Sequence, residues 1–188
     1  DDQIAIKWYR LAAEQGFAEA QTNLGLMYGK GQGVEQNFSE AVKWYRLAAE
    51  QGLAQAQHNL GVMYGRGQGV QKNFFEAFWW FKRAAEQGYG QAQYNLGLIY
   101  SRGEGVPKDN EEAIKWYRLS TEQGISGAQS NLGLMYEKGL GVEQDYIEAH
   151  KWFNIAGVNG NTTGKKNVDI IEKKMQPGQI IRAISLAR

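Results

Sequence analysis

The sequence predicts an all-α solenoid built of 36-residue helix-turn-helix repeats. The stretch from Asn23 to Val34 (NLGLMYGKGQGV) returns three times with small changes, each time 36 residues later and without an insertion. A tryptophan follows each copy after ten further residues, in the order Trp44, Trp80, Trp116 and Trp152. A strict period of this length is typical of a solenoid, in which each repeat buries its apolar face by stacking on its neighbours.

The first helix of a repeat is predicted from Ala18 to about Lys30. Ala20, Leu24 and Tyr28 follow one another at helical spacing and form an apolar stripe. Gly25 lies on the same side and returns in every copy. Because a glycine inside a helix costs roughly 1 kcal/mol relative to alanine, its recurrence indicates close approach of the tryptophan-bearing helix.

The second helix has clear start and stop signals. An Asn or Asp precedes it, with a Glu three residues later, and this pattern predicts a capping box in each copy. Its core face carries Ala41, Trp44, Tyr45 and Ala48. It ends where a glycine fits the left-handed C′ position, followed by an apolar residue that packs back on the last turn. The caps are Asn37, Asn73, Asp109 and Asp145, and the glycines are Gly16, Gly52, Gly88 and Gly124.

The unbroken period predicts one solenoid domain over residues 1–188. Residues 2–15 match residues 38–51, so the sequence opens on a second helix, and Trp8 and Ala12 lack a partner on one side. We expect a fragment of a longer protein or, alternatively, a face that another chain covers. After residue 160 the period fades into two helices, the last opened by Pro177, that serve as a cap. The expected segments are 1–16, 17–52, 53–88, 89–124, 125–160 and 161–188.

Composition excludes several classes of function. The formal charge is +1, from 21 Lys and Arg against 20 Asp and Glu, which gives no basic footprint for nucleic acid. No apolar run reaches the length of a membrane span. The given sequence also contains no signal peptide, which carries little weight because it opens inside a repeat. The absence of cysteine excludes disulfides and thiolate metal sites, and periplasmic, secreted and cytoplasmic locations all stay open.

The repeat resembles two related families of helical repeats. Leu24-Gly25-x-x-Tyr28 and Ala41-x3-Tyr45 match the tetratricopeptide signature, whereas Gln21 replaces its tryptophan and no closing proline follows. The loop is longer than in that family and carries Gly31-x-Gly33-Val34. With this loop and Ala-x2-Trp, the pattern is similar to the bacterial SEL-one-like repeat (SLR) family over residues 1 to about 160.

This resemblance implies a right-handed α/α superhelix whose first helices form a concave wall. It also implies an adaptor or scaffold that binds a peptide or protein partner on this wall. Cysteine-rich members of the family are reported to bind β-lactams, so a β-lactam-binding or hydrolysing protein is a remote alternative. This chain has no cysteine, and it lacks both Ser-x-x-Lys and Lys-Thr-Gly of the serine β-lactamases.

Nothing in the sequence predicts an enzyme, a metal site or a cofactor. The two histidines, His58 and His150, lie on different helices about two and a half repeats apart. At ~8–10 Å for each packed layer they cannot share a site. We expect both to be ordinary surface or half-buried side chains.

Candidate binding residues lie on the outward part of the first helices. An asparagine column and a basic column run beside a column that varies between copies, and amides and cations of this kind grip peptide backbone and carboxylates. Alternatively, the asparagines satisfy backbone groups between repeats and the bases complement helix dipoles. The candidates are Asn23, Asn59, Asn95 and Asn131, then Lys30, Arg66, Arg102 and Lys138, then Thr22, His58, Tyr94 and Ser130.

A second candidate is an excess of aromatic residues on one second helix. Phe75 stands where other copies have Ser, Glu or Ile, and Trp79 where all others have lysine, with Arg83 one turn further. Exposed tryptophan beside arginine is typical of contact hot spots. A self-covered cation–π cluster is the alternative. Self-association through this patch or the open N-terminal face is the alternative to the adaptor function.

Overall fold

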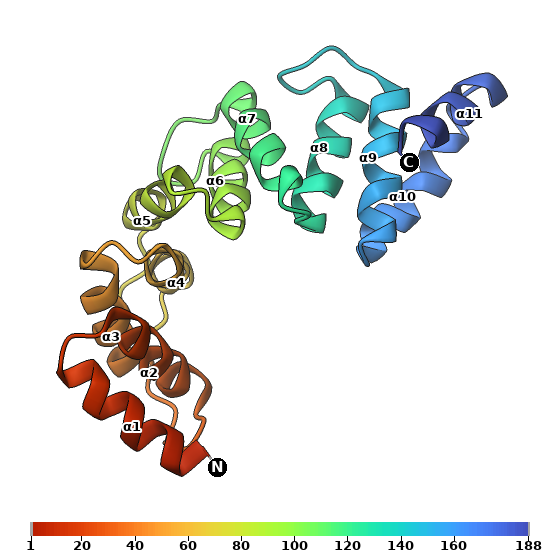
Figure 1. Ribbon diagram of the computed structural model, residues 1–188. Coiled ribbons are helices and arrows are strands. Elements are labelled where there is room, and N and C mark those ends of the chain that lie inside the picture. Colours follow the sequence, from red (N-terminus) through yellow and green to blue (C-terminus); the bar gives the residue numbers. More distant parts are fainter. Residues whose placement is uncertain (1, 188) are drawn as a thin grey trace. The chain divides into compact units, whose positions relative to one another are not determined.

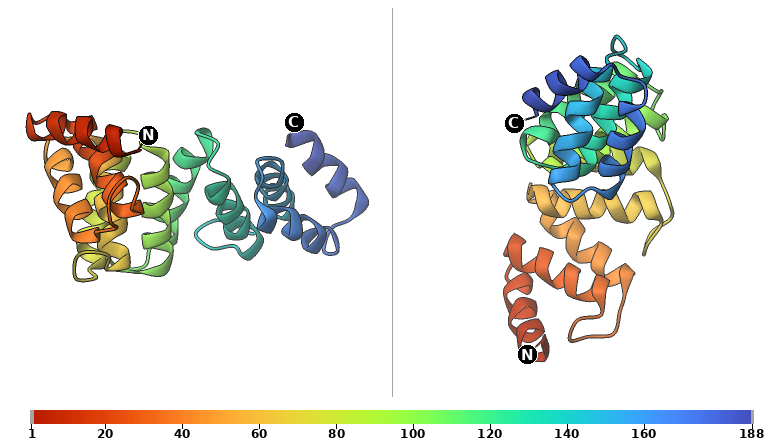
Figure 2. Two further views of the ribbon diagram at one scale, coloured as in Figure 1. Left: turned by 90° about the horizontal axis from the view of Figure 1, so that it is seen from below. Right: turned by 90° about the vertical axis from the view of Figure 1, so that its right-hand side faces the viewer.

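The computed structural model describes residues 2–187, and every regular element in that range is an α-helix (Figures 1 and 2). The predicted all-α repeat architecture is therefore confirmed. First and second helices alternate along the chain, and two further helices follow them. Their bounds are α1 Asp2–Glu14, α2 Ala18–Lys30, α3 Phe38–Glu50, α4 Ala54–Arg66, α5 Phe74–Glu86, α6 Gly90–Arg102, α7 Asn110–Glu122, α8 Ser126–Lys138, α9 Tyr146–Val158, α10 Thr162–Glu172 and α11 Pro177–Leu186.

The chain forms two compact units, of which one ends at Ala92 and the other begins at Gln93. In the first unit, α2 packs on α1 and α3, and α4 packs on α3 and α5. In the second unit, α8 packs on α7 and α9, and both α10 and α11 pack on α9. The expectation of a single domain without an internal boundary stays a prediction.

The second helices begin at the predicted caps, but the capping box is only half formed. The Asn37 side chain accepts a hydrogen bond from the Glu40 backbone amide at 3.0 Å. The Asn37 backbone amide donates to the Tyr28 carbonyl at 2.9 Å, so it does not need the Glu40 carboxylate as an acceptor. That carboxylate instead lies 3.7 Å from the amine of Lys43. The reciprocal box was therefore wrong, because the loop returns close enough to the first helix to satisfy the cap.

The predicted glycine stops are confirmed. Gly52 has a φ of 95°, and the amide of the following Leu53 reaches back to the Ala48 carbonyl at 3.3 Å. Gly16, Gly88 and Gly124 also have positive φ values. Because each stop comes directly before a first helix, the two helices of neighbouring repeats follow without a linker.

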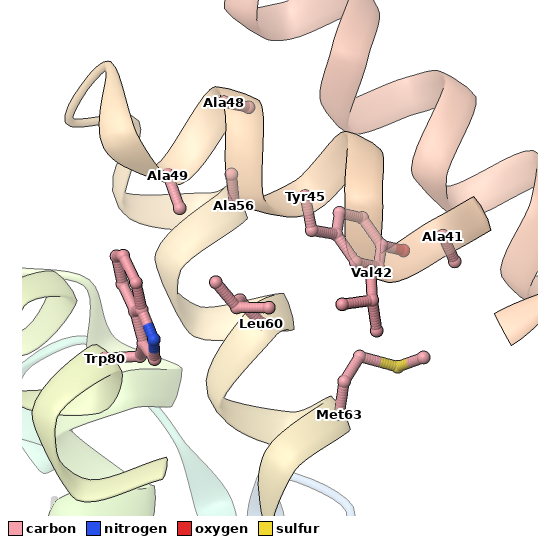
Figure 3. Packing of buried hydrophobic residues seen from close by; sticks show 9 residues of the cluster. All are labelled: Ala41, Val42, Tyr45, Ala48, Ala49, Ala56, Leu60, Met63 and Trp80. Atoms are coloured by element: carbon pink, nitrogen blue, oxygen red, sulfur yellow. The ribbon is translucent and has the colours of Figure 1, made fainter. Parts of the chain in front are cut away.

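Neighbouring repeats share one hydrophobic core. Figure 3 shows Trp80 of α5 facing Leu60 of α4 and Ala49 of α3, and all three side chains are buried in the same cluster. The helix glycine allows the two helices of a repeat to approach. A Cβ atom at Gly25 would lie 2.8 Å from the ring of Tyr45, so the predicted close approach to the tryptophan-bearing helix is confirmed.

Buried glutamines tie three successive helices together. The Gln21 amide on α2 donates to the Ala13 carbonyl of α1 at 3.1 Å, and its oxygen accepts from the Gln51 side chain, which follows α3, at 2.8 Å. Gln57 makes the equivalent bonds to Ala49 and Gln87. Polar groups in a core must be satisfied, and this arrangement satisfies both ends of each amide. The glutamine that replaces the tetratricopeptide tryptophan is thus a structural link between repeats.

The C-terminal helices cover the last second helix. His150 of α9 is 1% exposed, and its Nε2 lies 3.0 Å from the Glu172 carboxylate of α10. Its Nδ1 is also buried and has no hydrogen-bond partner among the described residues. The expectation of a surface or half-buried histidine was wrong here, because α10 closes over α9 at this point.

The outer face of α1 is open. Trp8 is 68% exposed, whereas the equivalent Trp80 is 9% exposed. Ile4 and Leu11 on the same helix are also exposed. The expected lack of a partner for Trp8 is therefore confirmed. In residues 2–187 no helix combines the length and apolarity needed to cross a membrane.

Candidate partner-binding grooves

Two hollows with equivalent linings open between first helices that follow each other in sequence. The α2–α4 groove has a volume of about 300 Å³, and the α6–α8 groove about 230 Å³. Every lining position of the second groove lies two repeats after a lining position of the first. The first is lined by Leu26, Gly29, Lys30, Gln36, Phe38, Tyr45, Asn59, Val62, Met63, Arg66 and Gln68. The second is lined by Leu98, Ser101, Arg102, Lys108, Asn110, Tyr117, Asn131, Leu134, Met135, Lys138 and Leu140.

A buried tyrosine from the second helix lies among the lining residues of each groove. Tyr45 is 5% exposed, and burial raises its pKa to about 12. Its hydroxyl makes no hydrogen bond to any residue in the range 2–187. In the other groove, the Tyr117 hydroxyl accepts from the Asn131 amide at 3.2 Å and lies 3.2 Å from the Ser101 hydroxyl. Burial raises the pKa of Tyr117, and these two hydrogen bonds partly oppose that rise.

The charged lining residues of both grooves are all cations. Lys30 and Arg66 are the last residues of α2 and α4 and are exposed. Arg102 and Lys138 hold the same place on α6 and α8, and Lys108 from the following loop adds a third charge. Cations at helix C-termini also complement the helix dipole, so the position of this column agrees with either interpretation, and partner binding stays a prediction.

Two further hollows are lined by residues from second helices and differ in charge. The hollow that includes Arg83 also has Glu50 and Glu86 in its lining. In the second unit, Arg118 and Lys151 share a hollow with Glu122 and Glu148. These two hollows hold charges of both signs, whereas the linings of the two grooves between first helices contain no carboxylate. Arg102 of the second groove lies 3.9 Å from the carboxylate of Glu104, which is outside the lining.

Six of the twelve predicted binding residues line the two grooves. They come from the asparagine and basic columns: Asn59, Asn131, Lys30, Arg66, Arg102 and Lys138. Asn23 and Asn95 are half-buried and line neither of these grooves. Whether these side chains bind a partner stays a prediction.

The variable column does not lie in these grooves. Thr22 and Ser130 are buried, and the Thr22 hydroxyl donates to the Ala18 carbonyl of its own helix at 2.9 Å. The Tyr94 ring lies 6.3 Å from that of Tyr117. The prediction that this column faces outward was therefore wrong, because it turns into the contact between helices.

His58, in the same column, is held among aromatic rings. Its ring centre lies 5.6 Å from that of Phe81 and 5.2 Å from that of Tyr89. Burial lowers its pKa, although the contact of its Nδ1 with the Asn59 side chain at 3.3 Å acts in the opposite direction. In residues 2–187 no group of three or more acidic or histidine side chains is placed to hold a metal ion.

Sequence reasoning missed the tyrosines of the grooves. Tyr45 was assigned to the core by its spacing, and its burial agrees with that, but its position also places it among the groove residues. The available signal was the change from Gly29 to Ser101 at equivalent positions, because this position lines the groove beside the tyrosine hydroxyl.

The aromatic residues of α5 form an exposed patch. Phe75 is 53% exposed and Trp79 46%. Their ring centres lie 6.1 Å apart with the rings nearly perpendicular. The Arg83 guanidinium lies over Trp80 at 5.5 Å, and the cation over Trp79 is Lys82 at 5.6 Å. Arg83 therefore pairs with the buried Trp80 and not with Trp79. Whether the patch is a contact surface stays a prediction.

Helix pairs of this kind, with shared cores between repeats, define a helical-repeat protein. The Sel1 repeat family matches the sequence over residues 1–17, 18–53, 54–89, 90–125 and 126–161. The chain belongs to the Sel1 repeat family, and the resemblance to SEL-one-like repeats is confirmed. Members of this family commonly serve as protein-interaction modules. A search among curated proteins found no match.

Solved structures of bacterial proteins share this fold. A Sel1 repeat protein from Oxalobacter formigenes is 42% identical, with a TM-score of 0.85 over 99% of this chain and 76% of its own. The protective antigen c5321 of uropathogenic Escherichia coli, with an SLR fold, is 37% identical, with a TM-score of 0.86 over 96% of this chain. The present chain spans 39% of that antigen. The immunity protein Pa5087 from Pseudomonas aeruginosa, at 22% identity and a TM-score of 0.59 over 97% of this chain and 72% of its own, shares the fold.

Proposed function

We propose that this chain is a non-enzymatic adaptor that binds acidic segments of a protein partner in the α2–α4 and α6–α8 grooves. The observation that carries the proposal is the repetition of one lining, with a tyrosine, an asparagine and a pair of cations, at equivalent positions of two repeats. Equivalent sites in two repeats suit a partner that carries several similar segments.

The groove offers each part of such a segment a complementary group. Lys30 and Arg66 provide the positive charge that a carboxylate needs, and hydrogen bonds to ionised groups are roughly twice as strong as neutral ones. The Asn59 amide can bond the backbone of a peptide. Because its pKa is about 12, the Tyr45 phenol stays protonated at neutral pH and can donate its proton to an acceptor.

Charge reversal in one groove tests the proposal. A random-peptide display library is selected on the full chain, and the affinities of individual peptides are then measured by fluorescence anisotropy. We expect the selected peptides to be rich in Asp and Glu. The double variant Lys30→Glu with Arg66→Glu should lower the affinity of peptides that occupy the α2–α4 groove at least ten-fold.

A matched control variant changes the net charge of the protein by the same amount, but at residues outside the grooves. Lys166→Glu with Lys173→Glu reverses two exposed cations that lie outside both grooves. This control should leave the affinities within two-fold. If it weakens binding as much as the groove variant does, the effect comes from net charge and the proposed site is wrong.

Self-association is a second candidate function, because α1 exposes a row of apolar side chains. Ile4, Trp8 and Leu11 are 56%, 68% and 51% exposed. Apolar side chains gathered on one helix are a common interface. Sedimentation velocity over a hundred-fold range of concentration should then show dimers that disappear in Trp8→Gln. A monomer at every concentration excludes this candidate and leaves the groove proposal untouched.

A further inference from the structure

Helix α5 differs from the other second helices on its solvent face. The position of Trp79 carries lysine in the equivalent helices, as Lys43, Lys115 and Lys151. Phe75, one turn earlier, replaces a residue that is Ser, Glu or Ile in the other full repeats. The exchange removes a cation and adds two aromatic side chains at the same place.

The lysine of the other repeats has a defined partner. The Lys43 amine lies 3.7 Å from the Glu40 carboxylate and 5.6 Å from the ring centre of Trp44. In α9, the Lys151 amine lies 2.6 Å from Glu148 and 4.8 Å from the ring of Trp152. The amine thus lies close to both a carboxylate and an indole ring.

Helix α5 has the equivalent carboxylate and indole ring, in Glu76 and Trp80, but Trp79 stands in place of the lysine. Glu76 is the equivalent of Glu40, and its carboxylate makes no ion pair with any residue that the structure describes. The buried indole nitrogen of Trp80, like that of Trp44, has no hydrogen-bond partner among these residues, so Glu76 does not accept from it as Glu148 accepts from Trp152. Arg83 restores the cation over the Trp80 ring but not the partner of Glu76.

The aromatic pair beside Glu76 is exposed although it has local contacts. Trp79 meets the edges of Phe75 and Phe78, at ring distances of 6.1 Å and 5.9 Å, and nearly half of its surface is still accessible. Lys82, which lies over Trp79, is 3.9 Å from the carboxylate of Glu86. The local cation therefore has an anionic neighbour of its own, and Glu76 stays uncompensated.

We propose that Phe75, Glu76 and Trp79, here named the aromatic–acidic patch, bind a basic side chain of a protein partner. The partner's arginine pairs with the Glu76 carboxylate and stacks on Trp79, and so supplies from outside the cation that three other repeats hold within the chain. Arginine suits this place better than lysine, because its planar guanidinium both stacks on an aromatic ring and bonds a carboxylate with two donors.

This inference does not rest on the function proposed above. The patch shares no residue with either groove and selects the opposite charge in its ligand. Peptides that bind the grooves are expected to be acidic, whereas peptides that bind the patch are expected to be basic. Failure of one proposal therefore leaves the other standing.

The test uses random dodecapeptides displayed as a library and selected on the full chain. Peptides that the wild type retains and that Phe75→Ser with Trp79→Lys loses should contain arginine or lysine well above the frequency in the library. This double variant copies the side chains of α3 and restores the internal Lys–Glu pair, so it is expected to fold. For the same peptides, Glu76→Gln keeps the aromatic surface and should lower the affinity at least five-fold.

A gain-of-function variant provides the matched control. Glu111→Phe with Lys115→Trp builds the same patch on α7, where Glu112 takes the place of Glu76. It should bind the selected basic peptides at a second site of similar affinity. The inference is overturned if the peptides lost with Trp79 carry no excess of basic residues, if Glu76→Gln binds them unchanged, or if the patch mediates a homodimer.

Discussion

The α2–α4 groove and the α6–α8 groove have the same positions in their linings but differ in how the tyrosine is held. Ser101 and Asn131 bind the Tyr117 hydroxyl, whereas Gly29 leaves the Tyr45 hydroxyl without a partner in the described part of the chain. The helices and the buried faces are otherwise repeated. The repeat therefore fixes the packing, while the polar groups of each groove are free to diverge.

The rims of the two grooves diverge in the same manner. The loop residue Gln36 in the first groove corresponds to Lys108 in the second, and Phe38 corresponds to Asn110. The second groove is therefore more cationic and less aromatic. We expect it to favour segments with more carboxylates, while the first groove favours a segment that also carries an acceptor for the Tyr45 hydroxyl.

The largest expected effect is a loss of stability when a methyl group is added at Gly97, against the ring of Tyr117. In Gly97→Ala the new Cβ atom would lie 2.6 Å from the ring of Tyr117, which its hydrogen bonds hold in place. Overpacking of this kind costs about 1 to 3 kcal/mol, which exceeds the gain in helix propensity. Urea unfolding followed by circular dichroism measures the loss. Gly25→Ala should cost less, because Tyr45 has no such bonds and can shift.

The control for this substitution is Gly65→Ala. Its Cβ atom would meet only the Ala77 side chain, at 3.7 Å, and the position has ordinary helical geometry. It should stabilise the protein by up to about 1 kcal/mol through helix propensity alone. Equal effects at Gly65 and Gly97 would show that the close approach to Tyr117 imposes no constraint.

The next effect is a loss of stability at alkaline pH that comes from Tyr45. Burial favours its neutral form and raises its pKa to about 12, whereas the unfolded chain releases this proton near pH 10. The contribution of the neutral Tyr45 side chain to the free energy of unfolding is therefore fully present below pH 10 and is lost as the pH rises towards 12. At pH 11 the wild type should have lost about 1.4 kcal/mol more than Tyr45→Phe, relative to pH 8.

Tyr117 provides the comparison at alkaline pH. Its pKa is also raised by burial, but the hydrogen bonds with Ser101 and Asn131 act in the opposite direction. Tyr117→Phe should therefore prevent a smaller part of the loss of stability at alkaline pH than Tyr45→Phe does. Denaturation at pH 8, 10 and 11 separates the two, and equal relief would mean that the hydrogen bonds leave the Tyr117 phenol unaffected.

Period and capping residues predicted most of the fold because they act locally. The glycine at position 52 and the cap at position 37 act within a few residues, and the structure confirms both. The cap's second hydrogen bond was mispredicted because its acceptor, the carbonyl of Tyr28, belongs to the preceding helix. Periodicity does not show how closely a loop returns to that helix.

The candidate site was harder to predict, because exposure depends on which helices meet. Thr22 and Lys30 lie on the same first helix, yet contact between helices buries the first and leaves the second exposed. A column that varies between copies is therefore an ambiguous signal. In the column of Thr22 the variation reflects local packing. In the column that contains Gly29 and Ser101 it reflects the chemistry of the groove.

Removal of the Tyr117 hydroxyl should have a moderate effect at neutral pH. Tyr117→Phe leaves the Asn131 amide and the Ser101 hydroxyl without this partner in a partly buried place. A typical net hydrogen bond contributes about 1 kcal/mol, so we expect a loss of that order in urea unfolding at pH 7. Tyr45→Phe should change the stability by less than about 0.5 kcal/mol, because no bond is lost. A larger loss at Tyr45 than at Tyr117 would contradict the difference between the grooves.

The smallest effect should come from converting one groove into the other. In Gly29→Ser the new Cβ atom lies 3.7 Å from the Ala41 side chain and 3.9 Å from the Tyr45 hydroxyl, so the serine fits without strain. It gains helix propensity and a hydrogen bond like that of Ser101, and we expect about 0.5 to 1 kcal/mol of stabilisation by urea unfolding. Gly29→Ala gains helix propensity without the hydrogen bond, and because alanine is the better helix former its gain should be about as large as that of serine. Serine should also weaken the peptides that use the Tyr45 hydroxyl, whereas alanine should not. If both variants bind these peptides equally, the free hydroxyl of Tyr45 plays no part in recognition.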